Sequence, residues 1–335
     1  MGEYILFAAV TVFTMALCVC IGSVNIPLKE TFSVLINAVC GIPQAEGSVS
    51  PALILDVRLP RVCCVALVGA ALSVCGAAMQ GLLRNPLADG STMGVSSGAS
   101  LGAVIAIAFG ITIPGLPYSG TVVMAIIFAF ASLLLILGLA YKLDFSLATN
   151  TIILIGVIFN MFASSIMSLI IAFAGNKVKT ITFWTMGSFA SSSYKSALLL
   201  VVAFLICGTI ILHYARELNA FAIGEDNARH IGVDVKKVKL ITLIAMSVLI
   251  GVCVSVGGTI GFVGLVIPHM TRMVVGPNHK RLLPASIFTG ATFLLLADLV
   301  SRIIIKPLEL PIGVVTSFVG SIAFVYIFYT TRKAK

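Results

Sequence analysis

Long apolar runs separated by short polar loops dominate the hydrophobic pattern of this chain. The runs lack the alternation of apolar and polar residues that marks a half-buried strand, so they predict helices. Gly, Pro and charged residues bound ten such runs. They lie near residues 4–22, 62–82, 92–110, 120–141, 150–173, 196–214, 239–257, 261–275, 284–304 and 312–330. Several fall short of the roughly 20 residues that cross a bilayer, so we expect some helices to be tilted or partly re-entrant.

Composition places these helices in lipid. Hydrophobic residues make up 59% of the 335-residue chain, charged residues 10%, and the mean hydropathy is +1.15. A water-soluble domain could not hide that much apolar surface in its core. Backbone groups in lipid must be satisfied internally, which favours helices. We therefore predict an all-α polytopic membrane protein with about ten transmembrane helices, forming a single domain over residues 1–335.

The termini and the charges suggest an orientation. The opening segment, MGEYILFAAVTVFTMALCVCIG, has no basic leading region and no small-residue cleavage site, so we expect it to be a retained span. The net charge of +9 comes from basic residues scattered over short loops, which argues against nucleic acid. With the N-terminus inside, thirteen of the 21 Lys and Arg residues fall on the cytoplasmic side and eight outside. This bias predicts that both termini are cytoplasmic.

Candidate enzyme chemistry is sparse in the sequence. The eight cysteines sit mostly in apolar runs without a CxxC pair, and no HExxH, His/Cys cluster or GxxxxGK[ST] loop is present. We expect no catalytic residue and no metal site. Asp298 and Arg302 stand four residues apart on one predicted helix and are expected to form a structural ion pair. Asp298 is also the residue that a proton-coupled secondary transporter would use.

Small and polar residues recur at helical spacing. Gly94, Gly98 and Gly102 form a stripe that predicts close packing between helices in lipid. Two more polar stripes are expected to face protein or water, because polar groups facing lipid are costly. Either they pack against other helices or they line a translocation path. Their candidate path residues are Asn160, Ser164, Ser168, Thr316 and Ser317.

Several long stretches together resemble one known family. They include RLPRVCCVALVGAALSVCGAAMQGLLRNPLADGSTMGVSSGASLGA at 58–103, FWTMGS at 183–188 and AIGEDNARHIGV at 222–233. GGTIGFVGLVIPHMTRMVVGPNHKRLLPASIFTGATFLLLADLVSR at 257–302 and ELPIGVVTSFVG at 309–320 also match. In this order they are similar to the FecCD-type permease subunits of type II ABC importers, which take up iron-siderophores, heme and vitamin B12. The resemblance covers the chain from about residue 58 onward.

The resemblance implies a transport function. The chain would be a multi-pass permease of the bacterial cytoplasmic membrane, paired as a homodimer or with a sister permease, with the path at the interface. Two cytoplasmic ATP-binding subunits would bind ATP and Mg, so this chain would be no enzyme and would carry no cofactor. An external substrate-binding protein would deliver an iron-siderophore or related metal chelate. Heme or cobalamin is the alternative cargo, and an ion-coupled secondary transporter is a further alternative.

The resemblance also assigns roles to particular residues. The polar loop 215–239 would form short helices that contact the ATPase subunit. Its expected coupling residues are Gly224 at a tight turn, Glu225 in a first helical turn, the small Ala228, the neighbouring Arg229 and Gly232 at a helix end. Outer arginines would dock the binding protein, namely Arg58, Arg61 and Arg302. A cytoplasmic gate would lie in two turns, at Asn85 and at Thr149 and Asn150.

Overall fold

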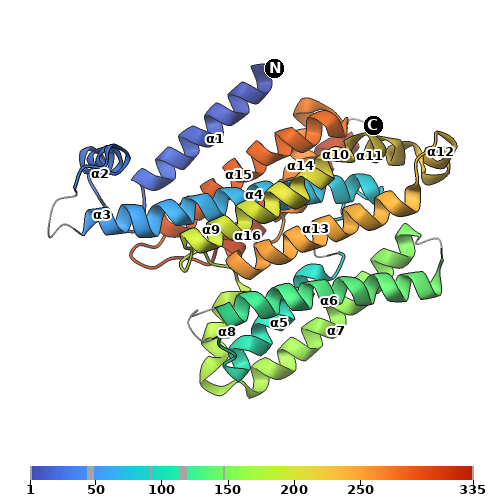
Figure 1. Ribbon diagram of the computed structural model, residues 1–335, viewed down its shortest axis with the longest axis horizontal. Coiled ribbons are helices and arrows are strands. Elements are labelled where there is room, and N and C mark those ends of the chain that lie inside the picture. The colour runs from blue at the N-terminus through green and yellow to red at the C-terminus, as the bar shows by residue number, and fades with distance from the viewer. Residues whose placement is uncertain (1, 44–48, 91, 114–118, 146–147, 334–335) are drawn as a thin grey trace.

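The computed structural model describes residues 2–43, 49–90, 92–113, 119–145 and 148–333, and its regular elements are helices (Figure 1). The first half contains α1 Gly2–Cys20, α2 Leu28–Cys40, α3 Ser50–Ala52, the π-helical turn η1 Leu53–Arg58, α4 Leu59–Leu82, α5 Val95–Phe109, α6 Ser119–Leu143 and α7 Thr149–Phe173. The middle contains the 3-10 turn η2 Gly175–Lys177, α8 Val178–Thr185, α9 Tyr194–Ala203, the π-helical turn η3 Phe204–Gly208 and α10 Thr209–His213. The last part contains α11 Ala215–Ile223, α12 Glu225–His230, α13 Val235–Gly257, α14 Val263–Val275, α15 His279–Ile303 and α16 Ile312–Lys333. The all-α prediction is confirmed.

Each predicted apolar run contains a helix. Among the described residues, seven helical segments are long and apolar enough to cross a membrane. They are Gly2–Cys20, Ser50–Leu82, Gly120–Leu143, Thr149–Phe173, Tyr194–His213, Val235–Gly257 and His279–Ile303. Three shorter apolar helices complete the predicted set, over Val95–Phe109, Val263–Val275 and Ile312–Ile327. The π-helical turns η1 and η3 keep two of the long segments continuous.

Helix α4 runs through the middle of the bundle (Figure 1). The most apolar part of the Ser50–Leu82 segment is 83% buried, against 22% for α1. α4 packs against α15, α14, α13, α9 and α11. The contacts are close because glycines meet: a Cβ added to Gly69 would lie 2.4 Å from the Gly290 carbonyl oxygen, and one added to Gly76 would lie 1.8 Å from that of Gly264. Small residues thus let the α4 backbone touch its neighbours.

A second group of helices, α5 to α8, lies beside α13 (Figure 1). The glycine stripe on α5 packs against α6, as predicted. A Cβ added to Gly98 would lie 2.3 Å from the Ser132 hydroxyl oxygen, and one added to Gly102 would lie 2.3 Å from the Met124 carbonyl oxygen. Helix α7 packs mainly on α5 and α6, and α13 also packs on both, so α7 and α13 share these two packing partners.

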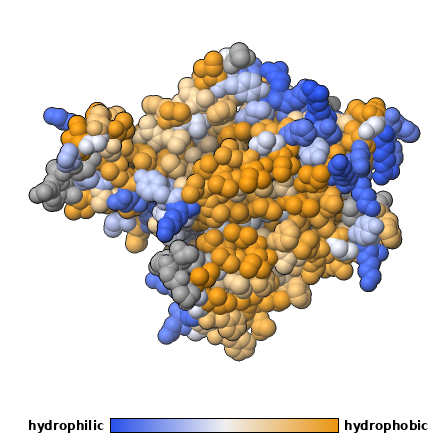
Figure 2. Space-filling view, viewed as in Figure 1, coloured by the Kyte–Doolittle hydropathy of each residue, from blue (hydrophilic) through white to orange (hydrophobic). Residues whose placement is uncertain are grey.

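The outer surface of the bundle is hydrophobic across its middle. Figure 2 shows a broad hydrophobic area flanked by hydrophilic residues at the two ends of the helices. This pattern suits helices that face lipid in their middle and water at their ends. Helices α2 and α8 were not expected, since both fall in stretches read as loops. α2 exposes Leu28, Phe32, Ile36 and Val39, which is the composition of a helix lying at a membrane surface.

Candidate functional site

The predicted coupling loop consists of two short helices and a tight turn. α11 ends and α12 begins around Gly224, whose φ of +123° and ψ of 150° suit glycine and few other residues. α12 ends at His230, and Gly232 follows its C-cap residue with a φ of +90° and a backbone N–H that donates to the Arg229 carbonyl at 3.0 Å. Ala228 is fully buried, while Arg229 is exposed and forms a 3.4 Å ion pair with Asp226. The segment is therefore a compact helical unit.

The coupling segment and one predicted gate meet at a single carboxylate. Glu225 Oε1 accepts hydrogen bonds from Lys239 Nζ at 2.6 Å and from Thr149 Oγ1 at 3.1 Å. Lys239 Nζ also lies 3.4 Å from Thr149 Oγ1 and donates to it. These residues come from α12, from the first turns of α13 and from the first turn of α7. Lys239 is fully buried, so its ammonium depends on these oxygens for stabilisation.

The other predicted gate turn also borders the coupling segment. A Cβ added to Gly224 would lie 3.9 Å from the Arg84 Nη1 atom, so the Arg84 side chain, from the turn after α4, reaches the turn between α11 and α12. Asn85 itself closes its own turn, because its side-chain oxygen accepts from the Leu87 N–H at 2.9 Å. Asn150 is exposed beside Thr149. The gate roles of Asn85, Thr149 and Asn150 stay predictions.

The three outer arginines are buried in an internal network. Arg61 donates to Asp298 Oδ1 at 3.1 and 2.9 Å and to Glu309 Oε2 at 2.8 Å. Arg302 forms a 2.9 Å ion pair with Asp298 Oδ2, as the spacing predicted, and donates to two carbonyls at the end of α1. Arg58 donates to the carbonyls of Val19, Cys20 and Val24. The network ties α1, α4 and α15 together at one end of the bundle.

This burial constrains the predicted docking role. Arg58, Arg61 and Arg302 are 4%, 7% and 2% exposed, so their guanidinium groups are satisfied inside the chain. Glu309, at 29% side-chain exposure, is the more open member of the network. Docking to carboxylates of a partner would require these arginines to exchange internal partners for external ones. The docking assignment stays a prediction.

The candidate path residues divide into buried and exposed positions. On α7, Asn160 is half-buried and its Oδ1 accepts from Ser97 Oγ at 2.5 Å, whereas Ser164 and Ser168 are exposed. On α16, Thr316 is fully buried and Ser317 is exposed. Exposed hydroxyls within a membrane-spanning helix are costly against lipid, so this face of α7 suits contact with protein or water.

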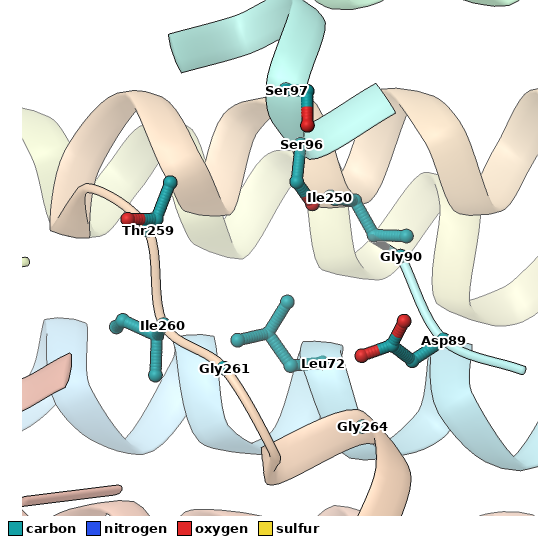
Figure 3. Close-up of a pocket in the computed structure, with 10 residues that line it drawn as sticks. All are labelled: Leu72, Asp89, Gly90, Ser96, Ser97, Ile250, Thr259, Ile260, Gly261 and Gly264. Carbon is teal, nitrogen blue, oxygen red and sulfur yellow. The ribbon is translucent and has the colours of Figure 1, made fainter. Parts of the chain in front are cut away.

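A pocket of about 150 Å³ lies between the helices (Figure 3). Its lining comes from α4, α5, α13, α14 and the loops that follow α4 and α13, and includes Leu72, Asp89, Ser97 and Gly261. Figure 3 shows the side chains of Leu72 and Asp89 directed toward the same space between the helices. Ser97 connects the pocket to Asn160, and a Cβ added to Gly261 would lie 3.6 Å from the Ser317 hydroxyl oxygen. Two of the lining residues, Ser97 and Gly261, thus lie close to residues of the predicted path helices α7 and α16.

Several residues of these networks had no role in the sequence interpretation. Lys239 was counted as one cytoplasmic lysine, although it falls on the buried stripe of α13 with Val235, Val238 and Thr242. A lysine on such a stripe is a signal of a buried ion pair, and helical spacing could have found it. Glu309 offered no such signal, because its partner lies 248 residues away in the chain. Within the described residues, no group of three or more His, Cys, Asp or Glu side chains could hold a metal ion.

A bundle of about ten apolar helices, with a compact polar helical unit tied to one end, defines a multi-pass membrane permease. Comparison with known proteins places it further. Residues 10–330 match the FecCD transport family, and the chain belongs to that family. The resemblance found in the sequence is confirmed.

Relatives and a solved structure agree with this placement. The chain is 44% identical over 324 residues to the uncharacterized ABC transporter permease protein YvrB of Bacillus subtilis, covering 96% of this chain and 90% of the relative. It is 33% identical to the iron(3+)-hydroxamate import system permease protein FhuB of the same organism, over 98% of this chain and 85% of that one. A solved chain described as an inward-facing metal-chelate type ABC transporter superposes with a TM-score of 0.85, at 32% identity, covering 98% of this chain and 99% of that one.

Membership of this family decides between the function classes. The chain is a transmembrane permease subunit of an ABC importer and works with ATPase subunits and a second permease. ATP hydrolysis belongs to a separate subunit, so this chain is not itself an enzyme. The alternatives of a membrane enzyme and an ion-coupled secondary transporter are set aside, and Asp298 serves in the ion-pair network instead.

Proposed function

We propose that this chain is the translocation subunit for an iron-siderophore or related metal chelate, carried across the bacterial cytoplasmic membrane. The observation that carries the proposal is the likeness, over 98% of the chain, to a transporter described as metal-chelate type. Named relatives support the same class of cargo, since they include an iron(3+)-hydroxamate permease and a hemin permease. In this proposal residues 1–335 form a single transmembrane domain with both termini in the cytoplasm.

The proposed assembly has two permease subunits, two ATP-binding subunits and an external binding protein. The second permease is a copy of this chain or a sister permease. The ATP-binding subunits bind ATP and Mg, and this chain holds no cofactor of its own. The α11–α12 unit contacts the ATPase through its exposed face, on which Arg229 lies, while the buried Ala228 fixes α12 to the bundle. Exposed Ser164, Ser168 and Ser317 face the second permease and the path between the two copies.

The proposed cycle needs no covalent chemistry in this chain. A loaded binding protein docks outside, and the arginine network exchanges internal for external carboxylates. ATP binding then closes the ATPase subunits and moves the α11–α12 units, and the gates at Asn85 and at Thr149 and Asn150 open or close in response. ATP can shift this equilibrium only because it binds the two states with different affinity.

Heme, cobalamin and molybdate remain to be separated from iron chelates by experiment, because named relatives import each of them. We would reconstitute the chain with its ATPase and binding protein in liposomes and measure ATP-driven uptake of a radiolabelled ferric hydroxamate. Unlabelled hemin, cobalamin and molybdate would be added in turn as competitors. The proposal predicts ATP-dependent uptake that another ferric hydroxamate suppresses most strongly. Uptake that cobalamin or hemin suppresses more strongly would move the cargo to the alternative class.

A further inference from the structure

A buried lysine joins the coupling segment to the start of α7. Lys239 has no exposed surface, and its Nζ donates to Glu225 Oε1 at 2.6 Å. Burying an ammonium without a partner is strongly unfavourable, so this lysine holds the carboxylate in place as firmly as the carboxylate holds the lysine. The position of α12 relative to α13 is therefore fixed by this pair.

The same carboxylate oxygen also accepts a hydrogen bond from a helix outside the coupling segment. Thr149 Oγ1 donates to Glu225 Oε1 at 3.1 Å, and Thr149 is the first residue of α7. Helix α7 packs mainly on α5 and α6, whereas α12 packs on α11 and α13. The three-residue junction of Glu225, Lys239 and Thr149 thus bonds the first turn of α7 to α12 and α13, which are not its main packing partners.

We propose that Lys239 is a positioning residue that holds Glu225 against Thr149, so that movement of α12 on the ATPase subunit is passed to the cytoplasmic end of α7. This inference rests on the proposed function, because it needs an ATPase that moves α12. The inference adds to the proposed function a hydrogen-bonded route from α12 to the predicted gate residue Thr149. A hydrogen-bonded charge pair suits this task, since it is short and directional and its lysine is buried.

The experiment uses the full importer in membranes and needs no knowledge of the cargo. The parent protein carries serine in place of the exposed Cys40 and a reporter cysteine, Asn150→Cys, at the predicted gate. The rate at which a membrane-impermeant maleimide labels this cysteine is measured with and without ATP and vanadate. Lys239→Met and Thr149→Val are compared with the parent. Thr149→Ser restores the hydroxyl. Glu3→Gln is the matched control, because it breaks a 3.0 Å ion pair with Arg281 that is exposed and far from the junction in the chain.

We expect the nucleotide-dependent change in labelling to fall at least about fivefold in Lys239→Met and Thr149→Val, the lower end of typical coupling factors. ATP hydrolysis persists in both variants, and Thr149→Ser and Glu3→Gln behave like the parent. The double variant loses no more than either single one, because both act through one junction. An unchanged response in Thr149→Val overturns the inference, and this variant keeps the ion pair should Lys239→Met fail to fold. A parent that captures no ATPase overturns the proposed function instead.

Discussion

Replacing Gly76 with alanine should force α4 and α14 apart. A Cβ at this position would lie 1.8 Å from the carbonyl oxygen of Gly264, 2.5 Å from its carbonyl carbon and 2.6 Å from its Cα. All three are backbone atoms, so no change of side-chain rotamer can relieve the clash. Cβ contacts shorter than 3.0 Å essentially never occur, so the two backbones must separate by about 1.2 Å along this line.

The structure sets the size of the effect. Extra atoms in a packed core cost about 1–3 kcal/mol where side chains can adjust, and here backbones must move. A gap of about 1 Å also forfeits a quarter to a half of the dispersion energy of each contact along the interface. We therefore expect Gly76→Ala to lower the free energy of unfolding by about 3 kcal/mol or more.

The assay is equilibrium unfolding in mixed micelles with increasing SDS, followed by circular dichroism. Gly138→Ala is the matched control, because Gly138 lies within α6 and an added Cβ meets no atom within 4 Å. Alanine should leave that site neutral or stabilise it by up to about 1 kcal/mol, the helix-propensity difference. The reasoning would be refuted by a Gly76→Ala protein that unfolds within about 0.5 kcal/mol of the parent, a difference typical of surface changes.

Three further predictions concern the buried network, the coupling turn and the cysteines. Arg61→Met should lower the free energy of unfolding by about 3 kcal/mol or more in the same assay, because the buried carboxylate of Asp298 loses a partner. Arg281→Met, which breaks an exposed ion pair, should lower it by under about 1 kcal/mol. Equal losses would contradict this. Gly232→Val should weaken ATPase capture in pull-downs, since valine strains a φ of +90° by about 1–3 kcal/mol; undiminished capture would contradict it. The exposed Cys40 should react with maleimide in the folded protein, whereas the buried Cys75 should react only after unfolding. Mass spectrometry would identify the labelled cysteine, and labelling of Cys75 in the folded protein would contradict the packing described.

The membrane helices were predictable because their signal is local. Each of the ten apolar runs contains a helix, and several runs were expected to be short for a full span, as three of the helices are. The glycine stripe on α5 and the Asp298–Arg302 pair also followed from helical spacing within one segment. Helix α2 was not predicted, because Leu28–Cys40 mixes polar and apolar residues and is too weakly hydrophobic to stand out as an apolar run.

The networks at the two ends of the bundle were not predictable, because their members are far apart in the chain. Glu225 and Thr149 were assigned to different roles and are 76 residues apart, yet they share a hydrogen bond. Arg61 meets Asp298 across 237 residues. An arginine near the outer end of a helix has the same sequence signature whether it points outward or inward, so burial had to come from the fold.

The unequal burial of the spanning helices has a consequence for how freely this sequence can change. In the apolar part of α1 only 22% of the residues are buried, so most of its side chains lie on the surface that faces lipid, where one apolar side chain can replace another. Around α4, which is 83% buried, each neighbour is a fixed atom of another helix. A saturating mutational scan should therefore find α1 tolerant of exchange among Leu, Ile, Val and Phe at most positions. The same scan should find α4 intolerant even of a single methyl group added at Gly69 or Gly76, so that two spans of similar hydropathy differ widely in the substitutions they permit.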